Sequence, residues 1–161
     1  MKKALAISNI LSWVNLIVGS ILVLIALLTL VALPMAAVLL SVVLIGCIVL
    51  HSYAAMQLHK SILNPAIPLN KQTPVGIRMM GYMALFFAVL LFSNAFLMLN
   101  DTEELLKQVQ LPPKMKMSDF TSIIRGTGIF ILLFSLSVFI NVIFNFRLMK
   151  IYMSANNNEI K

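Results

Sequence analysis

The sequence predicts an all-α integral membrane protein with four transmembrane helices, packed as an antiparallel bundle of two hairpins. The first observation is the run from Ala4 to His59, which contains no Asp, Glu, Lys or Arg. As a single helix this run would be roughly 80 Å long. Because the hydrocarbon core of a bilayer is only about 30 Å thick, the run must cross it twice. The second observation is the composition, with 61% apolar and 11% charged residues, whereas roughly a quarter of a soluble domain is charged.

The charge-free run predicts one hairpin, with spans over about 4–31 and 35–58 and a turn at Pro34. The turn carries no charge, so its backbone groups must find partners locally and it should be tight. Within the first span, Ser8, Ser12 and Asn15 step by three and four residues and therefore share one helix face. Small and mildly polar residues on one face favour close helix packing in lipid. We expect this face to be the seam against the other helices.

The second hairpin has spans over about 77–99 and 120–151, preceded by a proline-rich loop over 60–76. Between these spans, Asp101 and Glu104 resemble a helix-capping pair, and apolar residues follow them. This pattern predicts an outer amphipathic segment over about 102–111. The tail, 154–161, is predicted to be disordered. We expect one transmembrane domain over 1–161.

Loop charge predicts the orientation. With both termini inside, the inner segments carry eight basic residues against one acid, Glu159; the basic residues are Lys2, Lys3, Lys60, Lys71, Arg78, Arg147, Lys150 and Lys161. The outer connection balances its charges, with Lys107, Lys114, Lys116 and Arg125 against Asp101, Glu103, Glu104 and Asp119. The sequence therefore predicts a bacterial cytoplasmic (inner) membrane protein with both termini in the cytoplasm.

Polar residues inside the spans are the candidates for function. Asn15, His51 and Asn141 each lie roughly eight to eleven residues from the cytoplasmic end of a span, at a common depth of about 12–17 Å. Asn145 follows Asn141 by one turn on the same face. These four residues form a candidate intramembrane polar cluster. One interpretation is hydrogen bonding that fixes helix register. The sharper one is a small polar cavity in which His51 exchanges a proton or contacts a headgroup or substrate. His59 is expected to be only an interfacial polar residue.

Arg125, near the outer end of the fourth span, is a candidate contact for an anionic lipid headgroup; the alternative is that it only snorkels to the surface. The sequence predicts no catalytic, cofactor-binding or metal site. No acid lies within a span, Cys47 is the single cysteine, and no serine has a base and an orienting acid within reach. Nucleic acid is not expected as a partner, because the basic residues flank apolar spans instead of forming a stripe.

These observations favour a non-catalytic accessory or scaffold subunit, or a homo-oligomer, which acts through helix–helix contacts. Its expected partners are the lipid bilayer, other copies of itself and other membrane proteins. The alternative is a small transporter or channel component with a polar pathway near Asn15, His51 and Asn141. A third hypothesis is a lipid-modifying or headgroup-binding protein that uses Arg125 and the outer loop. The sequence carries no motif that is diagnostic of a family.

Overall fold

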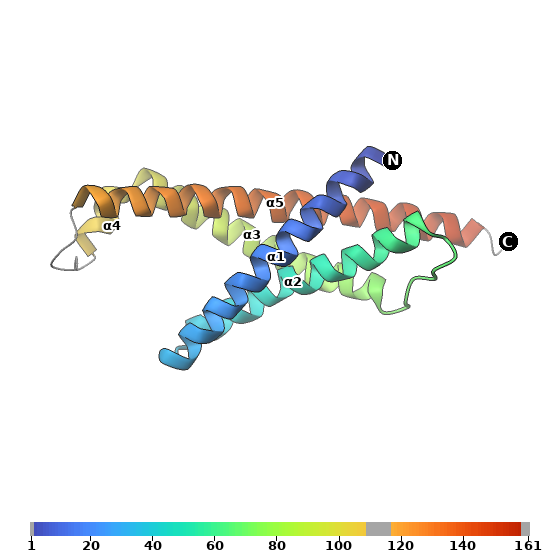
Figure 1. Cartoon of the computed structure of the whole chain (residues 1–161), viewed down its shortest axis with the longest axis horizontal. Helices are drawn as coiled ribbons and strands as arrows, with labels where there is room; N and C mark the ends of the chain where they lie inside the picture. The colour runs from blue at the N-terminus through green and yellow to red at the C-terminus, as the bar shows by residue number, and fades with distance from the viewer. Residues whose placement is uncertain (1, 109–116, 159–161) are drawn as a thin grey trace. The chain divides into compact units, whose positions relative to one another are not determined.

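The computed structural model describes residues 2–108 and 117–158. Within them the chain is helical and forms no strand; its helices are α1 (Lys2–Ala32), α2 (Ala36–Leu63), α3 (Thr73–Asn100), α4 (Thr102–Gln108) and α5 (Met117–Asn158) (Figure 1). Helices α1, α2, α3 and α5 are each long and apolar enough to cross a membrane. The predicted all-α class with four membrane-length helices is therefore confirmed.

The chain divides into two compact units. Unit 1 comprises Met1–Phe87 and Ser137–Lys161, and unit 2 comprises Ala88–Leu136. Helices α1 and α2 belong to unit 1 and α4 belongs to unit 2, whereas α3 and α5 each contribute a segment to both units.

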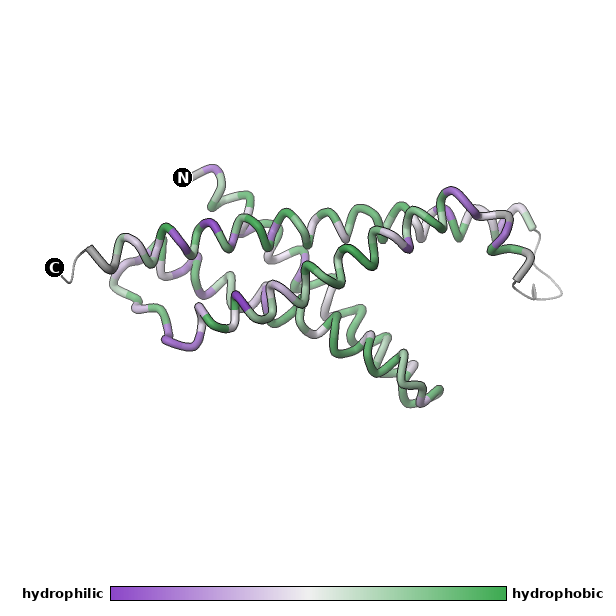
Figure 2. Tube along the Cα trace, turned by 180° about the vertical axis from the view of Figure 1, so that it is seen from behind, coloured by the Kyte–Doolittle hydropathy of each residue, from purple (hydrophilic) through white to green (hydrophobic). Residues whose placement is uncertain are grey.

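In unit 1, α1 and α2 form an antiparallel hairpin that reverses between Ala32 and Ala36 (Figure 1). The backbone N–H of Leu33 donates to the carbonyl of Thr29 at 2.7 Å, and the carbonyl of Met35 accepts from α2. The turn therefore pairs several of its own backbone groups locally, as expected for a charge-free turn in a membrane. Figure 2 shows apolar residues along most of both helices. Their outward side chains are open, with Val31 86% exposed, which suits a lipid-facing surface.

The connection between α2 and α3 is shorter than the predicted loop over 60–76, because both helices extend into it. Helix α2 continues through Leu63 and α3 begins at Thr73. Two asparagine side chains order the residues between them: Asn64 Oδ1 accepts from the Ala66 N–H at 3.3 Å, and Asn70 Oδ1 accepts from the Gln72 N–H at 3.0 Å. Pro74 lies in the first turn of α3, where its missing N–H costs no hydrogen bond.

The apolar core of unit 1 joins all the membrane-length helices near the chain termini and the α2–α3 connection. It contains one or two side chains from each helix: Leu5, Leu58, Ile77, Leu148 and Met149. Close helix contacts depend on glycine. A Cβ at Gly19 of α1 would lie 3.0 Å from Val49 Cγ2 of α2. These contacts hold the four segments side by side around the buried polar residues described below.

Unit 2 consists of α4 and the neighbouring segments of α3 and α5. Its buried apolar side chains are Ala88, Ala95, Leu106, Ile124 and Phe134. A Cβ at Gly128 would lie 3.1 Å from Leu99 Cδ2, so α3 and α5 approach closely here. Helix α4 covers the first part of the predicted amphipathic segment, and 109–111 lie outside the described residues.

The C-terminal end of α5 differs from the prediction. The sequence predicts a disordered tail over 154–161, but the helix continues through Asn158, and 159–161 lie outside the described residues. No Gly or Pro interrupts this stretch, and extending an existing helix by one residue costs far less than starting one. The helix therefore ends later than the apolar pattern does.

Candidate functional site

Five buried polar side chains of unit 1 form one cluster centred on Asn141 and Asn145, which lie one turn apart on α5. Both side chains are fully buried. Asn145 Nδ2 donates to Asn141 Oδ1 at 3.0 Å. This bond follows from the four-residue spacing, which places both amides on one helix face. We refer to these two asparagines and the side chains bonded to them, Ser8, Ser12 and His59, as the polar network.

Helix α1 contributes two serines to the polar network. Ser8 Oγ donates to Asn145 Oδ1 at 2.8 Å, and Ser12 Oγ donates to Asn141 Oδ1 at 3.0 Å. Both serines are fully buried. They lie on the α1 face that the sequence predicts to pack against the other helices. The two serines are four residues apart, as are the two asparagines, so the two hydrogen bonds form together in only one register of α1 against α5.

Helix α2 contributes His59, which is predicted to be only an interfacial polar residue but is buried inside unit 1 and bonded to Asn145. The side chain is 1% exposed, and its Nε2 lies 2.8 Å from Asn145 Oδ1. An amide oxygen only accepts, so His59 Nε2 is the donor. On the other side of the ring, Nδ1 lies 3.3 Å from Asn9 Oδ1, which is an acceptor. A neutral ring needs a donor there, which the amide NH₂ of Asn9 supplies when it faces Nδ1. His59 is buried because α2 continues beyond it to Leu63 and packs against α1 and α5.

Asn15 lies on the same face of α1 but bonds to a different residue. Ser137 Oγ donates to Asn15 Oδ1 at 2.8 Å, and Asn15 Nδ2 donates to the Ser137 backbone carbonyl at 3.4 Å. This reciprocal pair is a second link between α1 and α5, one turn along α5 from Asn141. Asn15 is fully buried, with both ends of its amide satisfied.

His51 is separate from the polar network. Its Nδ1 lies 3.2 Å from the backbone carbonyl of Ile77 in α3, and its ring meets the Phe146 ring edge-on at 6.3 Å between centroids. Of the four predicted cluster residues, the described contacts bring Asn141 and Asn145 together, while Asn15 and His51 bond elsewhere. The reason is rotational: His51 and His59 are eight residues apart on α2, which turns their side chains by roughly 80° about the helix axis.

Three buried polar atoms have no hydrogen-bond partner among the described residues: His51 Nε2, Ser52 Oγ and Asn141 Nδ2. A buried polar group without a partner is destabilising, so such atoms call for an explanation. Each of these three atoms is free to form a hydrogen bond with a water molecule or a small polar ligand. The other polar side-chain atoms of the polar network are bonded within it, except His59 Nδ1, which lies next to Asn9.

The remaining candidates lie apart from these residues. Arg125 is an exposed residue of α5 in unit 2. Cys47 is a buried free thiol in α2. Across residues 2–108 and 117–158 no group of three or more His, Cys, Asp or Glu side chains is arranged to hold a metal ion.

The comparisons with known proteins give no relative. No protein family matches the chain, and neither the curated proteins nor the solved structures contain a similar one.

Proposed function

We propose that this chain is a small, non-catalytic multi-pass membrane protein that acts through helix–helix contacts, as an accessory or scaffold subunit or as a homo-oligomer. The observation that carries this proposal is the polar network, whose side chains come from α1, α2 and α5 and are bonded mainly to each other in a buried interior. A transport pathway needs polar groups that water or a solute can reach. A scaffold needs polar groups that fix helix register, and interhelical hydrogen bonds do this in lipid.

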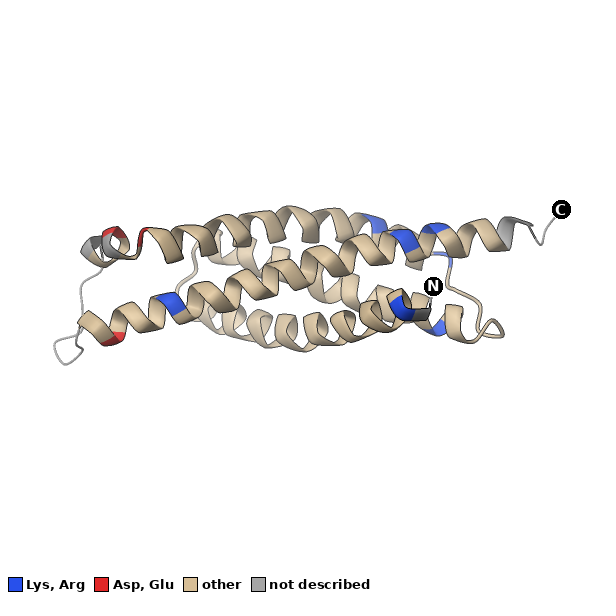
Figure 3. Ribbon diagram, turned by 90° about the horizontal axis from the view of Figure 1, so that it is seen from above, with Lys and Arg blue, Asp and Glu red and all other residues tan. Residues whose placement is uncertain are grey.

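The proposed architecture is an antiparallel bundle of two hairpins in the bacterial cytoplasmic membrane, with both termini in the cytoplasm. Its support is the charge distribution. Figure 3 shows the Lys and Arg residues of unit 1 near its chain termini and the α2–α3 connection. Unit 2 contains the acidic residues Asp101, Glu104 and Asp119 as well as the basic residue Arg125, so it lacks the basic excess of unit 1. An excess of basic residues favours the cytoplasmic side, where positively charged loops are retained.

Fusions at the C-terminus test this orientation. A fluorescent protein that folds only in the cytoplasm should be bright after Lys161, whereas alkaline phosphatase at the same position should be inactive. Fusions within the 109–116 connection should give the reverse pattern. Phosphatase activity at the C-terminus would refute the proposed orientation.

Purification tests the scaffold function directly. The full chain, extracted in a mild detergent, should elute with a stoichiometric membrane-protein partner or as a defined homo-oligomer in native mass spectrometry. Large apolar side chains cover the outward faces of the helices and offer contact area, for example Leu28 of α1 at 73% exposed. A monomer in both native membranes and detergent, with no partner recovered by cross-linking in cells, would refute the proposal.

The second candidate function is a small transporter or channel component with a pathway near Asn15, His51 and Asn141. It is favoured by the unpartnered atoms His51 Nε2 and Asn141 Nδ2, which could bind a passing proton or solute. His51→Leu distinguishes the two functions. In proteoliposomes with a trapped pH-sensitive dye, a proton-linked transporter would lose its flux on this substitution. A scaffold would show no flux in either protein and would keep its assembly.

A further inference from the structure

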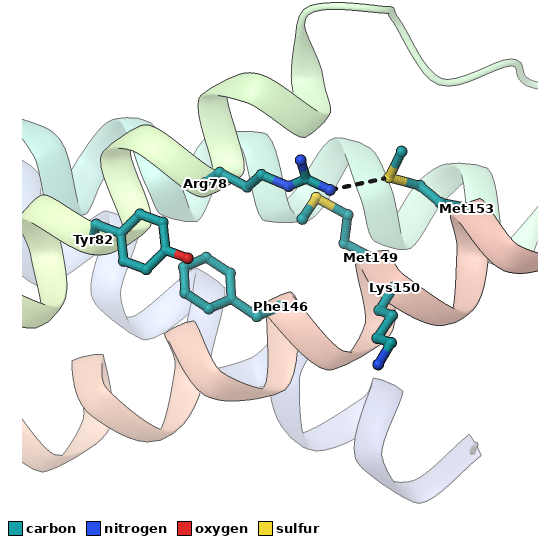
Figure 4. Close-up of a pocket in the computed structure, with 6 residues that line it drawn as sticks. All are labelled: Arg78, Tyr82, Phe146, Met149, Lys150 and Met153. Atoms are coloured by element: carbon teal, nitrogen blue, oxygen red, sulfur yellow. Dashed lines mark hydrogen bonds between the residues drawn. The ribbon is translucent and has the colours of Figure 1, made fainter.

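Unit 1 contains a pocket between α3 and α5 that belongs to neither the polar network nor His51. Its volume is about 460 Å³, and it is lined by Arg78, Tyr82, Phe146, Met149, Lys150 and Met153 (Figure 4). The volume lies within the range of roughly 300–1,000 Å³ that is usual for small-molecule sites. The lining combines two cations with an aromatic and thioether surface.

The two cations have no carboxylate to neutralise them in the described part of unit 1. The acidic residues of the described chain, Asp101, Glu103, Glu104 and Asp119, all belong to unit 2. The one polar contact of the Arg78 side chain among the described residues is from Nη2 to Met153 Sδ at 3.8 Å. A thioether sulfur is a weak acceptor, so the guanidinium keeps its donors for an anion. The pocket therefore attracts negative charge and has hydrogen-bond donors to hold it.

The apolar side of the pocket is formed by packed aromatic and thioether side chains. The rings of Tyr82 and Phe146 pack at 5.2 Å between centroids, and Phe146 also meets His51 edge-on. A Cβ at Gly81 would lie 2.6 Å from Phe146 Cε1, so the absence of a side chain at Gly81 is what admits the ring. Met149, at 4% exposed, packs into the core of unit 1. The pocket thus offers an apolar surface next to its cations.

The position of the pocket indicates an amphiphilic ligand. Arg78 follows the start of α3 by one to two turns, and Lys150 lies near the end of the apolar part of α5. Both residues therefore stand near the ends of the apolar parts of their helices. Beyond the pocket, α3 presents exposed apolar side chains along its length, including Met79, Met83 and Phe86. An anionic headgroup on the cations would leave its acyl chains against this surface.

On the orientation proposed above, with both termini in the cytoplasm, we propose that this pocket binds one anionic phospholipid of the cytoplasmic leaflet. The phosphate oxygens accept hydrogen bonds from the Arg78 guanidinium, whose planar fork matches two oxygens at once. The Lys150 ammonium, which points away from Arg78 in Figure 4, adds a second positive charge to the pocket lining. The Tyr82 hydroxyl borders the same space (Figure 4). Basic pockets between transmembrane helices on the cytoplasmic side are a known means of holding such headgroups. A lipid is favoured over an acidic protein segment because the pocket combines cations with a lipid-facing apolar surface.

Native mass spectrometry of the full chain in a mild detergent tests this proposal. The probes are phosphatidylglycerol, phosphatidylcholine with the same acyl chains, and glycerol 3-phosphate as a headgroup without a lipid. The pocket variant is Arg78→Gln with Lys150→Gln. The matched control is Lys60→Gln with Arg147→Gln, which removes the same two charges from exposed positions of α2 and α5 that do not line the pocket.

We expect wild-type protein and the control variant to retain phosphatidylglycerol in preference to phosphatidylcholine. At about 1 kcal/mol for each cation near an anionic surface, the pocket variant should bind phosphatidylglycerol about 30-fold more weakly. Conserving the charge, by Arg78→Lys with Lys150→Arg, should restore most of the binding. All substituted side chains are exposed, so folding should persist, and circular dichroism checks this.

Three outcomes would overturn the proposal. Equal losses in the pocket and control variants would show only general attraction to net charge. Equal retention of the two lipids would show that the cations do not select the headgroup. Glycerol 3-phosphate bound as tightly as phosphatidylglycerol would assign the pocket to a soluble phosphate compound instead.

Discussion

Asn145 is the residue whose removal should most weaken the contact between α1, α2 and α5. Its side chain bonds Ser8 and His59 at 2.8 Å each and Asn141 at 3.0 Å. A side-chain hydrogen bond inside a membrane protein contributes about 0.6 kcal/mol on average. Loss of three such bonds in Asn145→Ala should therefore lower the free energy of unfolding by about 2 kcal/mol.

The assay is equilibrium unfolding in mixed micelles with an increasing fraction of a denaturing detergent. Circular dichroism and the fluorescence of Trp13, the one tryptophan, report the transition. The matched control is Asn94→Ala, which makes the same change at an exposed position of α3 and should cost less than about 0.5 kcal/mol.

A double-mutant cycle separates the hydrogen bond from the loss of packing. Ser8→Ala and Asn145→Ala, alone and combined, should give a coupling energy of about 0.6 kcal/mol or more. Each single substitution removes the same Ser8–Asn145 hydrogen bond, whereas the packing lost at each position cancels in the cycle. A coupling near zero, together with equal effects of Asn145→Ala and Asn94→Ala, would refute the view that the polar network holds the helices together.

Two further predictions compare matched positions by the same unfolding assay. Gly81→Ala should destabilise the protein by about 1–3 kcal/mol because the new Cβ meets the Phe146 ring. At the control position Gly46, a new Cβ meets no atom within 4 Å, so Gly46→Ala should stabilise α2 by up to about 1 kcal/mol. Equal effects of the two substitutions would contradict the packing described here. His59→Leu should lower the free energy of unfolding by about 1–2 kcal/mol more than His51→Leu does. The reason is that His59 has polar partners at both ring nitrogens, whereas His51 has one at Nδ1 alone. The reverse order would contradict the assigned contacts.

Much of the fold follows from the sequence because a bilayer leaves few choices. A charge-free run longer than two crossings must reverse, and Pro34 marks where it does. Helix ends are harder to predict. At the α2–α3 connection, prolines argue for a long loop, but Pro74 lies within the first turn of α3, where proline is compatible with a helix.

The candidate site is predictable as far as spacing determines it. Asn141 and Asn145 must share a face, and so must Ser8 and Ser12. Depth in the membrane does not give the rotation of a helix, however. Depth alone therefore favours His51 over His59 as the histidine of the polar cluster. The spacing holds one usable signal: His59 lies seven residues after Ser52, so their side chains share one face of α2 to within roughly 20°, and both are buried. The rotation of α2 is set by packing across the whole helix, which a local pattern does not contain.

The central claim is that the polar network is dry and bonded to itself, and the reactivity of a cysteine placed within it tests this most directly. In a Cys47→Ser background, Ser12→Cys puts a thiol of similar size beside Asn141, and Lys60→Cys provides an exposed position near the end of α2. Inside-out membrane vesicles are treated with a charged, membrane-impermeant thiol reagent. We expect Lys60→Cys to be labelled and Ser12→Cys to react only after denaturation. Labelling of Ser12→Cys in the folded protein at a rate similar to Lys60→Cys would contradict the account and favour a water-filled pathway.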